Sequence, residues 1–127
     1  MNENELSKII VDKCLKIHKG LGPGLFESVY EKVLLHELVK VGLNCKTQVP
    51  IPIIWDNKIF DKTFFADLVV ENKVIIELKS IEEIAPVHKK QLLTHLKLSG
   101  IKLGLLINFG EELMKTGVTR LINGTLE

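Results

Sequence analysis

Charged residues interrupt two apolar segments near the middle of the chain. The run 74–79 is typical of a buried β-strand, yet it carries Glu77 and Lys79, whose side chains share a face because residues i and i+2 of a strand point the same way. Asp67 interrupts a second apolar run, 64–70. Charges are costly to bury, so they are usually paired, neutralised or bound to a metal. Two carboxylates beside one cation suit magnesium-dependent hydrolysis of a phosphodiester.

The same three residues also allow a structural interpretation. In the catalytic interpretation, Asp67 and Glu77 hold Mg²⁺, with Mn²⁺ as a substitute, and Lys79 stabilises developing charge or orients the attacking water. In the structural one, Glu77 and Lys79 form an ion pair, or Lys79 extends to solvent. The spacing alone leaves both interpretations open.

Two residues near the start of the second predicted helix, 25–41, are further candidates. Glu27 lies in the first turn, where a carboxylate interacts favourably with the helix dipole, and it is alternatively a third acidic metal ligand. Tyr30 follows three residues later on nearly the same face. A tyrosine at this position is more often a half-buried packing residue than a catalytic one.

A polar stripe runs along the third predicted helix, 86–99. Its members lie at positions i, i+3 and i+7 and are His88, Gln91 and His95. A polar stripe usually faces solvent, but this one could border the active site, where Gln91 would take part in catalysis by contacting phosphate or water. Positive charge near the stripe and before the glycine turn at 20–24 completes the predicted nucleic-acid contacts, which are Lys19, His88, Lys89, Lys90 and Tyr30.

The composition predicts one domain, residues 1–127, without a global attraction to nucleic acid. Lys and Arg number 17 against 16 Asp and Glu, so any affinity for phosphate must be local. The aromatic residues are few, and we expect no base-stacking platform among them. The two cysteines do not form a CxxC pair, which favours a reducing cytoplasm. An acidic, polar N-terminus and the lack of a long apolar run predict neither a signal peptide nor a membrane span.

The pattern of apolar residues predicts an α/β fold with a mixed central β-sheet flanked by helices, in the order α-α-β-β-β-α-β. The predicted helices are 4–19, 25–41 and 86–99, and the predicted strands are 45–55, 59–70, 73–79 and 102–109. Turns are expected at 56–58 and 71–73, and 117–123 could add an edge strand. A helix joins 73–79 to 102–109, so these two strands should be parallel.

Several separated motifs resemble the GxxExxY proteins of bacteria and archaea, in the same order and over about residues 5–123. The signature segment is 17–31, with Gly24, Glu27 and Tyr30 at its named positions. The further matching segments are 67–70, 76–79, 86–88, 91–93 and 104–110.

That family is assigned to the PD-(D/E)XK nuclease superfamily, so the resemblance implies a restriction-endonuclease-like core. It implies that Asp67 and Glu77 are metal ligands and Lys79 the catalytic lysine. Glu27 would be the acid on the first helix of the core, Gln91 the polar group on the helix after the motif, and the backbone carbonyl of Leu78 a further metal ligand.

Two residues depart from the resemblance. Phe65 stands where relatives often carry arginine. The loss of that arginine would weaken contact with phosphate, while the metal ligands remain. His95 stands where tyrosine is common.

These observations lead to a hypothesis and two alternatives. The hypothesis is a magnesium-dependent nuclease that cleaves DNA or RNA. We expect it to act as a homodimer or in a larger complex, because so small a core has difficulty holding both strands of a duplex. One alternative is a non-catalytic module on a nuclease fold that binds nucleic acid or a protein. The other is a structural domain with an ion-paired core.

Overall fold

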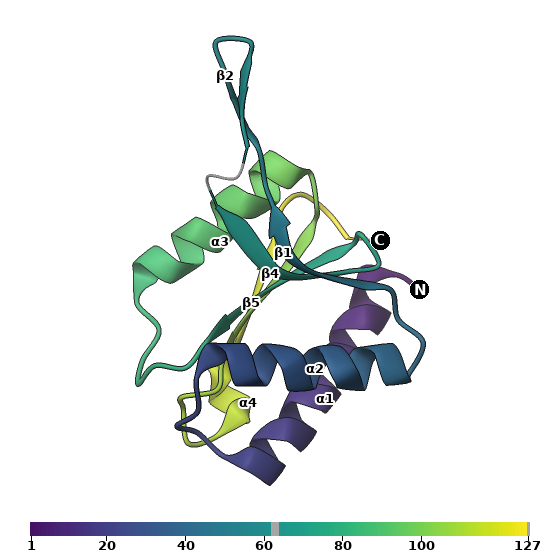
Figure 1. Ribbon diagram of the computed structural model, residues 1–127, viewed down its shortest axis with the longest axis vertical. Coiled ribbons are helices and arrows are strands. Elements are labelled where there is room, and N and C mark those ends of the chain that lie inside the picture. The colour runs from purple at the N-terminus through teal and green to yellow at the C-terminus, as the bar shows by residue number, and fades with distance from the viewer. Residues whose placement is uncertain (62–63, 127) are drawn as a thin grey trace.

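Two helices at the start of the chain cover one face of the sheet (Figure 1). The computed structural model describes residues 1–61 and 64–126. α1 (Glu3–Leu21) begins with a reciprocal cap, in which Asn2 Oδ1 accepts the Glu5 N–H at 2.8 Å and Glu5 Oε1 accepts the Asn2 N–H at 3.2 Å. α2 (Glu27–Lys40) is followed by Gly42, whose φ of 87° suits glycine. The two predicted helices are confirmed.

The main sheet has five strands in the order β1-β4-β5-β6-β7. Their bounds are β1 (Cys45–Pro50), β4 (Phe65–Val70), β5 (Val74–Lys79), β6 (Leu103–Asn108) and β7 (Val118–Ile122). β5 and β6 are parallel, and every other neighbouring pair is antiparallel. The predicted mixed sheet, its parallel pair and its C-terminal edge strand are confirmed.

The connections explain why these strands lie side by side. Glu71 and Asn72 adopt φ values of 52° and 54°, which is the backbone of a type I′ turn and joins β4 directly to β5. α3 (Pro86–Ser99) carries the chain from β5 to β6, with proline at its start and Gly100 at φ 75° after its end. A short helix, α4 (Met114–Gly117), precedes β7 and was not predicted.

The two long strands predicted over 45–55 and 59–70 are wrong. Each is divided, because β2 (Ile53–Trp55) and β3 (Lys58–Phe60) form a separate two-stranded sheet. Pro50 and Pro52 lack the N–H that a continuing ladder would need at this place. Residues 62–63, which the longer predicted strand included, lie outside the described residues. The hairpin 53–60, called the arm below, projects away from the main sheet (Figure 1).

Two apolar clusters hold the layers together. The larger cluster joins α1 and α2 to one face of the sheet, and among its fully buried members are Leu6, Ile10, Leu34, Leu68, Ile76 and Leu105. The smaller one joins α3 to the opposite face through Ile75, Leu92, Leu96 and Leu106. A Cβ at Gly104 would come within 3.0 Å of the Leu92 side chain, so glycine at this position lets α3 approach β6 closely. No helix within the described ranges is long and apolar enough to cross a membrane.

Candidate active site

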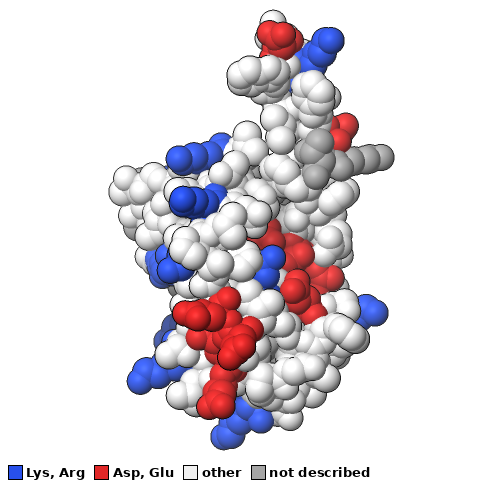
Figure 2. Space-filling view, turned by 90° about the vertical axis from the view of Figure 1, so that its left-hand side faces the viewer, with Lys and Arg blue, Asp and Glu red and all other residues white. Residues whose placement is uncertain are grey.

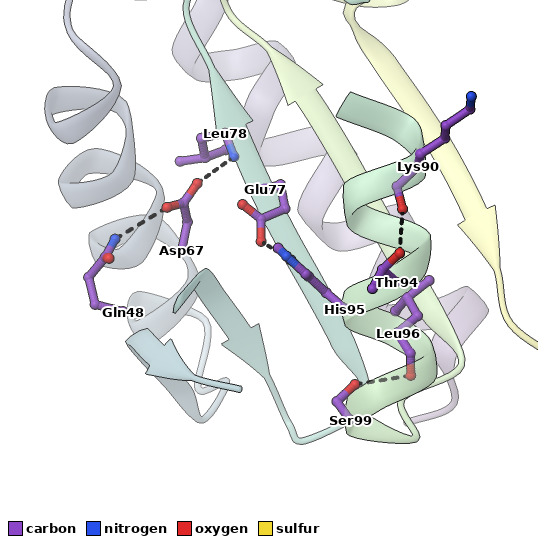
Figure 3. A network of polar contacts seen from close by, with 9 residues as sticks. All are labelled: Gln48, Asp67, Glu77, Leu78, Lys90, Thr94, His95, Leu96 and Ser99. Atoms are coloured by element: carbon purple, nitrogen blue, oxygen red, sulfur yellow. Dashed lines mark hydrogen bonds and ion pairs between the residues drawn. The ribbon is translucent and has the colours of Figure 1, made fainter. Parts of the chain in front are cut away.

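Asp67 lies where β4 separates from β5. The paired residues run from Val70 and Val74 only as far as Leu68 and Ile76. Beyond that point Asp67 Oδ2 accepts a hydrogen bond from the Leu78 N–H at 2.8 Å (Figure 3). The carboxylate therefore takes the place of a backbone acceptor, which fixes its position at the end of the ladder.

Gln48 holds Asp67 from the other side. It falls between the β1–β4 pairs Thr47–Leu68 and Val49–Ala66, and its φ is 48°, so the ladder is irregular opposite Asp67. Its Nε2 donates to Asp67 Oδ1 at 3.2 Å and to Glu31 Oε1 at 2.6 Å. One amide thus connects a carboxylate of the sheet with a carboxylate of α2.

These groups line an acidic hollow of about 150 Å³. Its lining residues are Glu27, Ser28, Glu31, Gln48, Asp67 and Leu78. The lining of this hollow has three carboxylates and no basic side chain. Figure 2 shows acidic side chains gathered on the face of the molecule that includes this region.

Glu77 lies on β5 and is turned toward α3. Its Oε1 is 3.1 Å from Nδ1 of His95, and its side chain is only 13% exposed. Burial raises the pKa of Glu77, the hydrogen bond with His95 opposes that rise, and the negative charge of Asp67 adds to it. The His95 ring in turn stacks on Phe64, with 4.3 Å between ring centroids. Glu77 is therefore held in place by His95 of α3, whose ring is itself supported by Phe64, the residue before β4.

A second hollow, called the lysine hollow below, has a volume of about 460 Å³ on the α3 side of β5. It is lined by Phe64, Glu77, Lys79, Lys90, Gln91, Thr94 and His95. Strand alternation explains the division, because Glu77 and Lys79 face α3 while the intervening Leu78 lines the acidic hollow. The predicted residues thus lie on both sides of β5: Asp67, Glu27 and Leu78 on one side, Glu77, Lys79, Lys90 and Gln91 on the other.

The ion pair considered between Glu77 and Lys79 is not formed. Within residues 1–61 and 64–126, the salt-bridge partner of Glu77 is His95. Nor does this part of the chain contain three His, Cys, Asp or Glu side chains already arranged around a metal position. Asp67 and Glu77 are brought to neighbouring strands as predicted, but each is engaged by a different hydrogen-bond partner.

Tyr30 has a structural role, which corrects the expectation that it contacts nucleic acid. Its side chain is fully buried and stacks on Phe109 with 4.2 Å between centroids and 7° between ring planes. Its hydroxyl donates to the Gly22 carbonyl at 2.5 Å and accepts the Leu25 N–H at 3.2 Å. Tyr30 therefore fixes the turn that leads into Glu27, and no part of it is accessible to a ligand.

The remaining predicted contacts lie on helix surfaces. Lys19 is exposed in the last turn of α1, and Lys89 is exposed on α3. His88 Nδ1 accepts the Ala85 N–H at 3.0 Å, so this ring nitrogen caps the start of α3.

The segment after Lys79 is fixed by a set of contacts that the sequence did not indicate. Ser80 Oγ donates to the Leu25 carbonyl at 2.5 Å, and Asn108 Oδ1 accepts the N–H groups of Ile81 and Gly110, each at 3.0 Å. A Cβ at Gly110 would overlap the backbone of Ile81, so the two segments touch directly. The chain leaving Lys79 is consequently tied both to the turn before α2 and to the end of β6.

Sequence reasoning also missed Glu31, Gln48, Phe64 and Thr94. Glu31 lies one helical turn after Glu27, and the i, i+4 spacing was a usable signal for a shared face. Gln48 gave no such signal, because its role depends on a positive φ and on partners distant in the chain. Phe64 and Thr94 line the lysine hollow only because the C-terminal half of α3 lies against Phe64, the residue before β4.

The mixed sheet with helices on both faces, and acidic and basic groups around its central strand, define the class of α/β nuclease-like domains. The chain belongs to the PD-(D/E)XK nuclease superfamily, whose family model matches residues 4–121. The predicted superfamily and its restriction-endonuclease-like fold are thus confirmed, while the GxxExxY resemblance within the superfamily stays a prediction.

The chain was also compared with solved structures and with curated proteins. A solved structure of a protein named SSO0001 is similar with 20% sequence identity and a TM-score of 0.48, over 96% of this chain and 79% of that one. A search of curated proteins gave no match.

Proposed function

We propose that this chain is a metal-dependent nuclease that hydrolyses phosphodiester bonds in DNA or RNA. Membership of the superfamily supports a nuclease-like function. The observation that carries the proposal is the position of Asp67, held by the Leu78 N–H in an acidic hollow with Glu27. Lys79 and Gln91 line the hollow on the other side of the same strand. Acid, base and amide groups therefore lie around one strand, and in the proposed reaction they would act on a single phosphodiester.

The donor set fits a hard divalent cation such as Mg²⁺ or Mn²⁺. The proposed ligands are the carboxylates of Asp67, Glu27 and Glu77 and the backbone carbonyl of Leu78. A carboxylate has about four lone-pair sites, so the two hydrogen bonds that Asp67 accepts leave it able to bind a metal. Glu77 would have to release His95 to join the same ion. When bound, the metal supplies polarisation of a phosphoryl oxygen and a more acidic water.

Side chains of this protein would stabilise charge on the phosphate, orient the attacking water and bind the backbone of the nucleic acid. The Lys79 ammonium would neutralise charge that develops on the phosphoryl oxygens. Gln91 would orient the attacking water or hold a phosphate oxygen, since its amide can both donate and accept. Lys90 lines the same hollow, and Lys19, His88 and Lys89 would supply weaker, sequence-independent contacts to the backbone of the nucleic acid.

Cleavage assays with matched variants test the proposal. Asp67→Asn and Lys79→Ala should abolish magnesium-dependent cleavage of mixed single- and double-stranded substrates while leaving the circular dichroism spectrum unchanged. Glu112→Gln and Lys115→Ala are suitable controls, because both side chains are exposed and lie outside the two hollows. Cleavage at the wild-type rate by Asp67→Asn would rule the proposal out.

A second candidate function is a module that binds nucleic acid or a protein without cleaving it. The engagement of Glu77 by His95 favours it, since that pair holds Glu77 away from the Asp67 side of β5. It predicts binding without turnover and little loss of affinity on Lys79→Ala. The homodimer or larger complex rests on the small size of the domain and stays a prediction.

A further inference from the structure

The arm and its base hold most of the aromatic side chains of this protein. Four of its seven Phe, Tyr and Trp residues are Trp55, Phe60, Phe64 and Phe65. Trp55 is 74% exposed, Phe60 46% and Phe65 42%. Such rings normally contribute to a core, yet Trp55 and Phe60 lie exposed on the projecting hairpin, and Phe65 is exposed at the start of β4.

The two faces of the arm differ in chemistry. Trp55 pairs with Lys58, and Phe60 lies two residues beyond Lys58, so the three side chains share one face. This aromatic face combines two rings with an ammonium group. The opposite face carries the cross-strand pair Ile54 and Ile59, each 67% exposed. Only the first face has the aromatic and basic groups that stack on and neutralise a nucleic acid strand.

The arm and the lysine hollow are close to each other along the chain. Phe64 lines that hollow and stacks on His95, which contacts Glu77. Phe64 is the fourth residue after Phe60, so an extended chain spans at most about 14 Å between them. A strand lying on the aromatic face would therefore reach the hollow that contains Lys79 without a long gap.

The arm itself gives reasons to expect a ligand. An isolated two-stranded sheet is at best marginally stable in water, and exposed apolar patches on otherwise soluble surfaces often mark binding sites. Asp56 and Lys58 balance each other, so the arm offers no net charge to attract phosphate. Its contribution to binding must then come from the faces of its rings, which requires bases that are not already stacked in a duplex.

We propose that the aromatic face of the arm, formed by Trp55 and Phe60 with Lys58, stacks the unpaired bases of a single strand of DNA or RNA and leads that strand to the lysine hollow. Single-stranded nucleic acid is accordingly the substrate class of the site, and this inference rests on the proposed nuclease function. A duplex hides the faces of its bases, so it gains nothing from these rings.

Trp55 is the only tryptophan in the chain, so its fluorescence reports on the arm directly. The first experiment titrates the protein, in EDTA to prevent cleavage, with a 12-nucleotide oligo-dT, the matching oligo-rU and a blunt duplex of the same length. The proposal predicts quenching of Trp55 by at least one single strand and little quenching by the duplex. Equal quenching and affinity for the duplex, or no quenching by either single strand, would overturn it.

Variants then separate stacking from general hydrophobic contact. With a dye-labelled oligonucleotide, Trp55→Leu should weaken binding about 5- to 150-fold, whereas Trp55→Phe should retain most of the affinity. Ile59→Ala is the matched control, because it removes an exposed apolar side chain from the opposite face. Equal affinities for wild type and Trp55→Leu would contradict the proposal.

The outcomes distinguish this inference from the proposed function. Quenching and binding without any cleavage would support the arm as a strand-binding surface and count against the nuclease. Cleavage of single strands that Trp55→Leu leaves unchanged would support the nuclease and overturn the role of the arm. A blue shift of Trp55 emission with rising protein concentration alone, together with a dimer in sedimentation, would assign the arm to a second copy of the chain and also overturn it.

Discussion

Tyr30→Phe is the sharpest test of how the turn before α2 is held. The substitution removes only the hydroxyl group and keeps the ring that stacks on Phe109. Two hydrogen bonds disappear, one to the Gly22 carbonyl and one from the Leu25 N–H. Each bond contributes about 0.5–1.5 kcal/mol net, so the free energy of unfolding should fall by about 1–3 kcal/mol.

Denaturant unfolding followed by circular dichroism measures this loss, and calorimetry gives the thermal midpoint. For a chain of this length the midpoint should fall by about 3–15 °C. The slope of the unfolding free energy against denaturant should not change, because the substitution leaves the buried core in place. Phe26→Leu is the matched control, since Phe26 lies in the same turn but is 83% exposed.

The opposite pattern would refute the reasoning. If Tyr30→Phe were as stable as the wild type but bound nucleic acid much less tightly, the hydroxyl would act on a ligand and not on the turn. Such a result would mean that Tyr30 also adopts a conformation in which its hydroxyl reaches a ligand.

Three further substitutions test the energetics of the fold. Gly110→Ala should lower the free energy of unfolding by about 1–3 kcal/mol or more, because the new methyl group overlaps the Ile81 backbone, and a wild-type denaturation curve would contradict that close approach. Burial raises the pKa of Glu77 in the folded state, so between its unfolded and folded pKa values the native protein binds more protons than the unfolded chain. Glu77→Gln should therefore gain stability relative to the wild type as pH rises through that interval and keep the gain above it. Unfolding curves that show no pH-dependent difference from wild type would count against this. Glu37→Gln should instead lower the stability at neutral pH. The hydrogen bond from Lys16 and the nearby positive charges lower the pKa of Glu37, so the stabilisation that the Glu37 carboxylate provides is present at neutral pH and lost in acid. Thermal scans of wild type and variant across that pH range check this.

The sequence predicted most of the fold because its signals are local. Helix 86–99 is bounded by Pro86 and Gly100, and the turn at 71–73 needs a backbone that Asn adopts readily. The division of 45–55 and 59–70 was missed because the apolar alternation continues through both breaks. Alternation shows which side chains share a face of a strand but does not show which strand is its partner. The sequence pattern of a separate hairpin is therefore the same as that of one long strand.

The candidate site could be predicted only in part for a related reason. Asp67 and Glu77 follow from their places in a hairpin, and the predicted adjacency of their strands is confirmed. The hydrogen bonds that hold them apart come from Gln48 and His95, which are 19 and 18 residues away along the chain. Such contacts depend on long-range packing and on one unusual backbone angle, and neither is encoded in spacing.

Calorimetric titration with Mg²⁺ and Mn²⁺, comparing the wild type with the double variant Asp67→Asn/Glu77→Gln, tests the central claim most directly. The two substitutions keep the size of each side chain and remove its charge. The account predicts that the wild type binds metal and that the double variant does not. Metal binding of equal affinity in both proteins would contradict it, because the ion would then lie away from the strand that carries the proposed site.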